Sequence, residues 1–414
     1  MEKKESQKWM YALMPYNATI FFIGTFIPLF ILKRGGNVVD IGLATAFYNL
    51  SLTIFSLIWG MVIDRIESRK ILLVSGISLM TILILIILKA GNPTNIIMVY
   101  ALLGISIAMI NTPINILIIE TSSKSSLNSS YNNFYWYSYI GGIIGQLGGA
   151  IWINFLGLEN SIYFSILLSI LTLGSFILLL KEPLITLERE NILMNLKAFS
   201  YKLLQIPLFF IRIPRIKDFV SFFRSIKIFL ERDFFIVMST IILFFASANL
   251  FFTSYTPYLK NVGLFDSEIF LLSTYITFVN TFSSLLLRKM KEGEELDIAK
   301  KALYIRFFGF FLASTFSVFI QNRLNFYTTL ISFTFIGIAY TLATIPLNVM
   351  LFKTLRPEKK GEEIGIFSSL NGITIFIVSF LSGLISKTLG YYVTFYLATI
   401  LIFIPILLLE TLRK

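Results

Sequence analysis

Residues 9–32 read WMYALMPYNATIFFIGTFIPLFIL, a stretch without a single charged side chain. A helix needs about 20 mostly apolar residues to cross the hydrocarbon core of a bilayer. Eleven further stretches of this kind follow, so the pattern predicts an all-α membrane protein with twelve transmembrane helices. The predicted spans are 9–32, 38–62, 70–89, 95–119, 131–156, 160–180, 234–258, 267–287, 301–320, 325–352, 363–386 and 391–410.

The composition of the whole chain agrees with this pattern. Hydrophobic residues make up 56% of the 414 residues and charged residues only 14%, against roughly 25% charged in soluble domains. The chain has no Cys and no His, which excludes disulfides, thiol nucleophiles and proton relays through histidine. No phosphate-binding loop of the Gly-x-x-x-x-Gly-Lys type is present, so we expect no nucleotide-driven pumping.

The positions of the basic residues provide a test of the helix count, because cytoplasmic loops carry an excess of Lys and Arg. If the N-terminus is placed inside and the sides alternate, 29 of the 35 Lys and Arg fall on the inner side, including the group from Arg288 to Arg306. One helix more or fewer would scramble this partition. The net charge of +12 therefore reflects topology rather than nucleic-acid binding, and we expect a multi-pass cell-membrane protein with both termini in the cytoplasm.

A long polar stretch divides the predicted helices six and six. It gives three predicted units, namely a bundle over 1–180, a linker over 181–233 and a second bundle over 234–414. Within the linker, IKDFVSFFRSIKIFLER at 216–232 separates aromatic and aliphatic residues from basic ones with helical spacing, as in helices that lie in a membrane interface. The segment is either a linker that rests on the membrane or a regulatory, partner-binding helix.

An internal repeat relates the two halves. PINILIIE at 113–120 matches PLNVMLFK at 346–353 with a fixed offset of 233 residues, which pairs Pro113 with Pro346. Both segments lie near the inner end of the fourth helix of their half. Parallel repeats of this kind are found in carriers that are built from two bundles.

The loop between the second and third spans reads GMVIDRIESRK, residues 60–70. It resembles the loop signature of the major facilitator superfamily, Gly, three residues, Asp-Arg, one residue, Gly, one residue, then two basic residues. The inner Gly is replaced here by Glu67. The resemblance implies a fold of two pseudo-symmetric six-helix bundles. It also implies a conformational latch that holds the outward-open state. The residues of that latch would be Gly60, Asp64, Arg65, Arg69, Lys70 and Glu120. The alternative is that these charges only fix topology.

The fifth span contains GGIIGQLGGA, residues 141–150. Small residues at this spacing let helices pack closely in lipid, which predicts a packing role for Gly141, Gly145 and Gly149. The run also resembles, imperfectly, the fifth-helix signature of exporters in the superfamily, with Gln146 in place of a Pro. Generic packing and an export-type helix are both open.

Every Asp, Glu, Lys and Arg is assigned by the predicted spans to a loop or to a helix end. Ionisable groups within the membrane normally mark ion and proton pathways, so their absence favours an uncharged or amphipathic solute. In the superfamily the first, fourth, seventh and tenth helices line the central cavity. By that resemblance the predicted substrate-binding residues are Asn17, Thr25, Asn111, Asn249, Tyr255 and Tyr340. The alternative is interhelical hydrogen bonding, worth about 0.6 kcal/mol on average.

These features together predict a secondary active transporter that moves a small neutral or amphipathic organic solute by alternating access, in the direction of export. Import of a sugar-like or other uncharged metabolite is the main alternative. A membrane enzyme and a non-transporting sensor are further alternatives that the residues favour less. We expect a monomer in the lipid bilayer without a catalytic residue, cofactor or metal. A coupling proton or ion remains open.

Overall fold

The computed structural model describes residues 8–63, 68–121, 127–180, 232–287, 293–356 and 360–412. Twelve helices in these ranges are long and apolar enough to cross a membrane. The amphipathic segment predicted at 216–232 lies outside the described residues except for Arg232.

The predicted spans are confirmed, and most of their ends agree within a few residues. A short 3-10 helix, η1 (Lys8–Ala12), precedes the first long helix. The first half then contains α2 (Leu13–Lys33), α3 (Val38–Ile63), α4 (Arg69–Leu88), α5 (Pro93–Glu120), α6 (Leu127–Asn160) and α7 (Ile162–Leu179). The second half contains α11 (Arg232–Asn261), α12 (Asp266–Leu286), α13 (Glu295–Phe319), α14 (Asn325–Thr354), α15 (Lys360–Leu389) and α16 (Tyr391–Glu410).

Helix α13 begins six residues before the predicted start at 301. Its first turn contains Glu295 and Asp297, and acidic side chains stabilise the positive end of a helix dipole. This earlier start places Arg306 in the interior of the helix and not at its end. The prediction that every charged residue lies in a loop or at a helix end is therefore wrong at Arg306.

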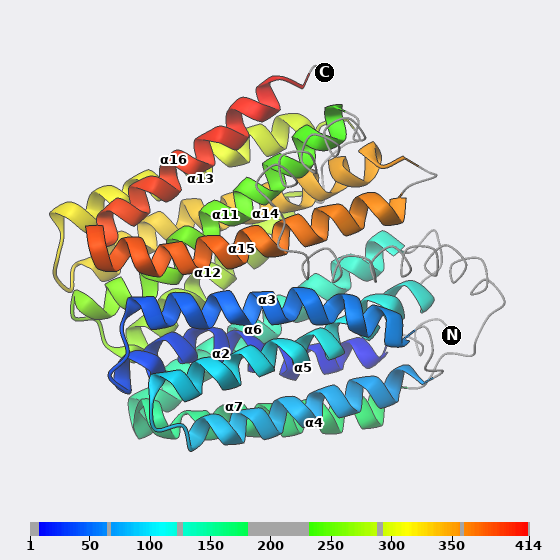
Figure 1. Cartoon of the computed structure of the whole chain (residues 1–414), viewed down its shortest axis with the longest axis vertical. Helices are drawn as coiled ribbons and strands as arrows, with labels where there is room; N and C mark the ends of the chain where they lie inside the picture. The colour runs from blue at the N-terminus through cyan, green and yellow to red at the C-terminus, as the bar shows by residue number, and fades with distance from the viewer. Residues whose placement is uncertain are drawn as a thin grey trace, which may run out of the picture.

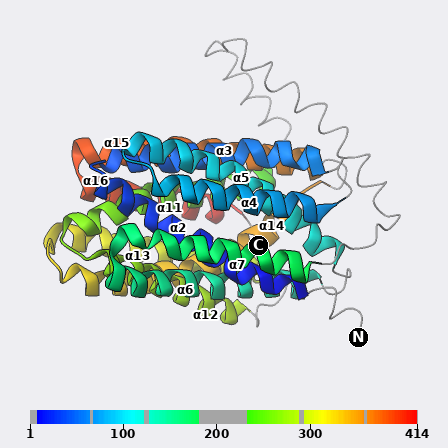
Figure 2. The same cartoon turned by 90° about the horizontal axis from the view of Figure 1, so that it is seen from below.

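The long helices form two bundles that lie side by side (Figure 1). The most extensive contacts between the bundles are those of α3 with α15 and of α6 with α12. Figure 2 shows these pairs on opposite edges of the molecule, with α11 and α2 between them. The prediction of two six-helix bundles is thus confirmed.

Helices α3 and α15 are close together at the end where α3 begins and separate toward the end where it finishes (Figure 1). Near the close end, a Cβ added to Gly42 would lie 2.9 Å from the carbonyl oxygen of Ser379, and one added to Gly383 would lie 2.6 Å from that of Val38. At Gly60, in the last turn of α3, an added Cβ would meet no atom within 4 Å. In the described residues, the two halves therefore pack most closely at the end where α3 begins.

The three glycines of α6 with a predicted packing role, Gly141, Gly145 and Gly149, lie against α2. A Cβ at Gly141 would overlap the backbone of Met14, and one at Gly145 would overlap the backbone of Ala18. At Gly149 it would lie 2.7 Å from the rings of Phe22 and Phe270. The spacing of the glycines thus places two helix backbones in direct contact, with an aromatic side chain of the second half beside them.

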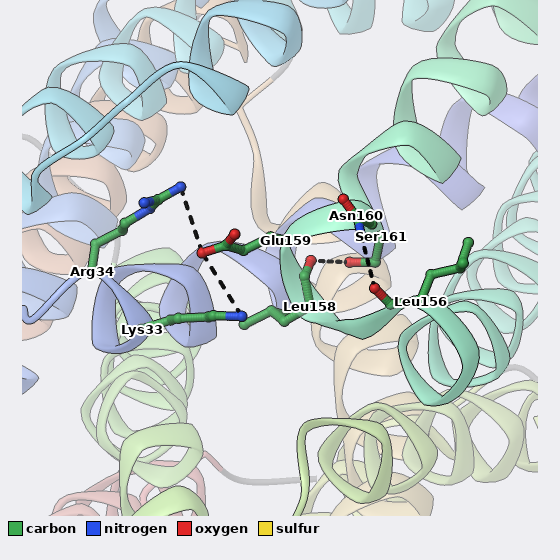
Figure 3. A network of polar contacts seen from close by, with 7 residues as sticks. All are labelled: Lys33, Arg34, Leu156, Leu158, Glu159, Asn160 and Ser161. Atoms are coloured by element: carbon green, nitrogen blue, oxygen red, sulfur yellow. Dashed lines mark hydrogen bonds and ion pairs between the residues drawn. The ribbon is translucent and has the colours of Figure 1, made fainter.

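The closed end also has an ion cluster within the first half. Glu159 lies between Lys33 and Arg34 (Figure 3), with its Oε1 atom 3.8 Å from Lys33 Nζ and 3.6 Å from an Arg34 guanidinium nitrogen. Gly157 has a φ of 78° in the turn before Asn160, a backbone conformation that favours glycine. Since these ion pairs are partly exposed, they add little stability.

Four prolines inside helices occupy equivalent places in the two halves, two of them in the repeated segments. Pro113 lies within α5 and Pro346 within α14, while Pro28 and Pro257 lie within α2 and α11. Neighbouring membrane helices can satisfy the backbone groups that a proline leaves free. The sequence repeat therefore corresponds to a structural one.

Candidate binding cavity

A cavity of about 320 Å³ lies between the halves. The first half contributes Phe21 of α2 and Tyr139 and Gln146 of α6, and α11 to α14 supply the rest of the wall. Aromatic and aliphatic side chains dominate this wall, among them Phe252, Tyr255, Ile276, Phe333 and Tyr340. Small-molecule sites have this character, an apolar surface with a few polar groups that fix orientation.

Two polar residues of the wall connect the halves. Thr277 of α12 donates a hydrogen bond of 2.8 Å from its Oγ1 atom to Gln146 Oε1 of α6, and both side chains are buried. One turn along α12, Asn280 also lines the cavity, and its Oδ1 atom is buried without a hydrogen-bond partner. An acceptor without a partner is costly in an apolar setting, so Asn280 Oδ1 would gain from a hydrogen-bond donor.

Arg306 is the one charged residue in the described part of the cavity wall. It is the twelfth residue of α13, which places it about 16 Å along the helix axis and close to the middle of a bilayer core about 30 Å thick. The side chain is fully buried, and its Nε, Nη1 and Nη2 atoms have no hydrogen-bond partner. No described acidic residue forms an ion pair with it.

Three aromatic rings surround this guanidinium. The Cζ atom of Arg306 lies 4.3 Å from the ring centre of Phe244, 4.9 Å from that of Phe310 and 5.8 Å from that of Tyr340. A desolvated cation–π contact contributes about 2 kcal/mol, whereas burial of an unpaired ion costs several kcal/mol. The rings therefore offset part of the cost but supply no hydrogen-bond acceptor in the guanidinium plane.

The structure separates the six predicted binding residues into two groups. Tyr255 and Tyr340 line the cavity. Asn17 donates to Leu13 O and Ser138 Oγ, Thr25 donates to Phe21 O, and Asn249 donates to Phe245 O. Asn111 accepts a hydrogen bond of 2.7 Å from Tyr16. In the present conformation these four side chains bind their own or neighbouring helices.

Sequence reasoning did not select Arg306 as a site residue. The segment ALYIRFFGFF, residues 302–311, surrounds it with apolar residues. This pattern is the sequence signal that indicates a charged residue within a membrane span. The predicted span 301–320 places Arg306 near its first end, where a basic residue is interpreted as a topology signal.

The predicted latch is described only in part. Asp64 and Arg65 lie outside the described residues, as does the side chain of Glu120. Arg69 donates from Nη1 to the carbonyl oxygen of Ile63 at 2.6 Å, which joins the end of α3 to the start of α4. Lys70 donates to the carbonyl oxygens of Ile177 and Leu180 at the end of α7, where the helix dipole favours a cation.

The second half has an ion pair at the place that corresponds to Glu120 in the sequence repeat. The 233-residue offset pairs Glu120 with Lys353, and Lys353 Nζ lies 2.7 Å from Glu295 Oε1 at the start of α13. Nearby, Arg356 Nε donates to Glu363 Oε1 at 2.6 Å, and that carboxylate is 1% exposed. These contacts join α14 to α13 and to α15 within one bundle.

Comparison with known proteins relates this architecture to one family. The family description Major Facilitator Superfamily matches residues 10–361. No curated protein matches the chain. Among solved structures, one described in a study of substrate recognition in proton dependent oligopeptide transporters has 13% sequence identity and a TM-score of 0.76, with 98% of each chain covered.

A second solved structure is that of a bacterial homologue of the human drug peptide transporters PepT1 and PepT2. It has 13% identity and a TM-score of 0.73, with 99% of this chain and 97% of that one covered. At this level of identity the likeness concerns the fold.

Proposed function

Because the chain belongs to the Major Facilitator Superfamily and is a multi-pass membrane transporter, we propose that it moves a small amphipathic organic solute by alternating access. The cavity between the halves is the proposed binding site. The observation that carries this proposal is its wall, which comes from both halves and combines aromatic surfaces with a few buried polar groups. Rocking of the halves would expose such a site to each side of the membrane in turn.

The contacts between the halves support this mechanism. The α3–α15 contact at Gly42 and Gly383 is close, whereas Gly60 has no neighbour within 4 Å of an added Cβ. If the N-terminus is cytoplasmic, as the basic residues predict, the closed end faces outward and the cavity is poised to open inward. Thr277 and Gln146 then form a hydrogen bond that strengthens contact between the halves beside the solute.

The prediction of a neutral solute depended on the absence of charged residues within the membrane spans. Because Arg306 lies within a span, we no longer expect the solute to be neutral. Export remains our proposed direction, and it rests on the glycine pattern of α6.

We also propose that the protein is a monomer in the cell membrane with both termini inside. The latch formed by Gly60, Asp64, Arg65, Arg69, Lys70 and Glu120 would bias the balance of outward- and inward-open states without contacting the solute.

A flux screen in proteoliposomes tests the proposed function. Purified protein is reconstituted and offered labelled sugars, amphipathic organic acids, amphipathic amines and dipeptides, with and without a proton gradient. Dipeptides are included because the solved structures of similar fold are peptide transporters. We expect saturable flux and counterflow of an amphipathic compound. Movement of hydrophilic sugars alone, and only inward, would contradict both the solute class and the direction.

A further inference from the structure

We propose that Arg306 binds the anionic group of the transported solute, which is a singly charged organic acid with an apolar body. This inference rests on the proposed function, because it identifies the class of solute that the cavity takes. It is carried by three observations: the unpaired guanidinium, the single charge in the cavity wall and the aromatic surfaces around it.

The first observation concerns hydrogen bonds. An arginine side chain has five N–H donors, and all three nitrogen atoms of Arg306 are buried without a partner. The rings of Phe244 and Phe310 interact with the positive charge but accept no bond in the plane of the donors. A carboxylate has two oxygen atoms that fit the arginine fork and would satisfy two of these donors at once. The site therefore lacks a hydrogen-bond acceptor for the guanidinium, and a carboxylate would supply one.

The second observation concerns charge. Among the residues that the structure describes, Arg306 is the only charged one that lines the cavity, so a ligand with one negative charge would neutralise the buried site. A dianion would leave one negative charge without a partner, and a cation would face the guanidinium in a medium of low dielectric constant, where like charges repel strongly. The charge of the wall thus favours a monoanion over a phosphate ester or an amine.

The third observation concerns shape and access. Tyr340 lines the cavity and also lies 5.8 Å from Arg306 Cζ, and its side chain is half-buried. Tyr340 is thus a neighbour of both the cavity and the guanidinium, and its ring contributes to the surface on which a bound solute would rest. The rest of the wall, including Phe252 and Phe333, is aromatic and suits an aryl or alkyl body. Asn280 Oδ1, which has no partner, would accept a hydrogen bond from a ligand hydroxyl or amide.

The absence of cysteine from the chain allows a direct test. The variant Asn280→Cys introduces the only thiol, and its rate of reaction is measured with an anionic sulfonate and a cationic trimethylammonium methanethiosulfonate. If Arg306 attracts anions, the anionic-to-cationic rate ratio falls by about tenfold when Arg306→Gln is added. Arg306→Lys should retain most of the ratio, because the charge is kept. An unchanged ratio in Arg306→Gln would overturn the proposal.

A control cysteine corrects for the general positive charge of the protein. Thr94→Cys lies at the start of α5, is exposed and is not part of the cavity wall, so its rate ratio should not respond to Arg306→Gln. Failure of both reagents to reach Asn280→Cys, with normal labelling of Thr94→Cys, would contradict the proposed function itself. That result is distinct from an unchanged ratio, which contradicts only the role of Arg306.

A matched pair of small molecules tests the ligand class. Labelling of Asn280→Cys with N-ethylmaleimide is repeated in the presence of 3-phenylpropanoate or its amide, 3-phenylpropanamide. We expect the acid to slow labelling at concentrations about tenfold lower than the amide, and this difference should disappear in Arg306→Gln. Equal protection by the two compounds, or protection by neither, would overturn the assignment of an organic acid.

Discussion

At the scale of single residues, the predictions were reliable where a property depends on the sequence nearby and failed where it depends on distant partners. Gly141, Gly145 and Gly149 were selected from spacing alone, and the structure places them against α2 and its side chains. Arg306 was missed because the apolar stretch before it is short and acidic residues begin the helix. Its surroundings come from α11, α13 and α14, which local sequence cannot bring together.

The close contact of Gly145 with α2 leads to a prediction about stability. A Cβ at this position would overlap the backbone of Ala18, so Gly145→Ala should lower stability by about 1–3 kcal/mol through overpacking. Thermal unfolding of the protein in detergent measures this change.

Gly174→Ala in α7 is the matched control for Gly145→Ala, since an added Cβ at Gly174 meets no atom within 4 Å. This control should be unchanged or slightly stabilised, because alanine is the better helix former. Equal unfolding temperatures for the two variants would show that the contact between α2 and α6 is looser than described.

At the scale of helices, length and apolar composition were sufficient to locate all twelve spans. The criterion works because a bilayer core imposes a minimum helix length. The criterion locates helix ends poorly, because charged residues can continue a helix into the membrane interface. Helix α13, for example, begins at Glu295 and not at the predicted residue 301. The contact of α3 with α15 was not predicted, since it joins residues more than 300 positions apart.

The α3–α15 contact leads to a prediction about the outer gate. A Cβ at Gly383 would lie 2.6 Å from Val38 O, so Gly383→Ala should disfavour the closed end and increase the outward-open population. Labelling of Asn280→Cys by an impermeant thiol reagent added outside should accelerate about five- to thirtyfold. Gly24→Ala is the control, because nothing lies within 4 Å of its added Cβ. A rate that is unchanged by Gly383→Ala would rule out this contact as a gate.

At the scale of the whole molecule, the 233-residue repeat and the loop motif at 60–70 predicted the two bundles and the superfamily. The location of the cavity could not be predicted in the same way. Its wall combines α2 and α6 with four helices of the second half, and only two of six predicted binding residues belong to it. The position of a cavity depends on which helix faces are left unfilled after packing.

In the proposed mechanism, one cavity opens alternately to the two sides of the membrane. The most direct measurement is the sidedness of Asn280→Cys labelling by an impermeant thiol reagent in right-side-out and inside-out vesicles. We predict labelling from both sides, with Gly383→Ala raising the outside rate and lowering the inside rate. Labelling from one side only, or two rates that change in the same direction, would contradict alternating access through this cavity.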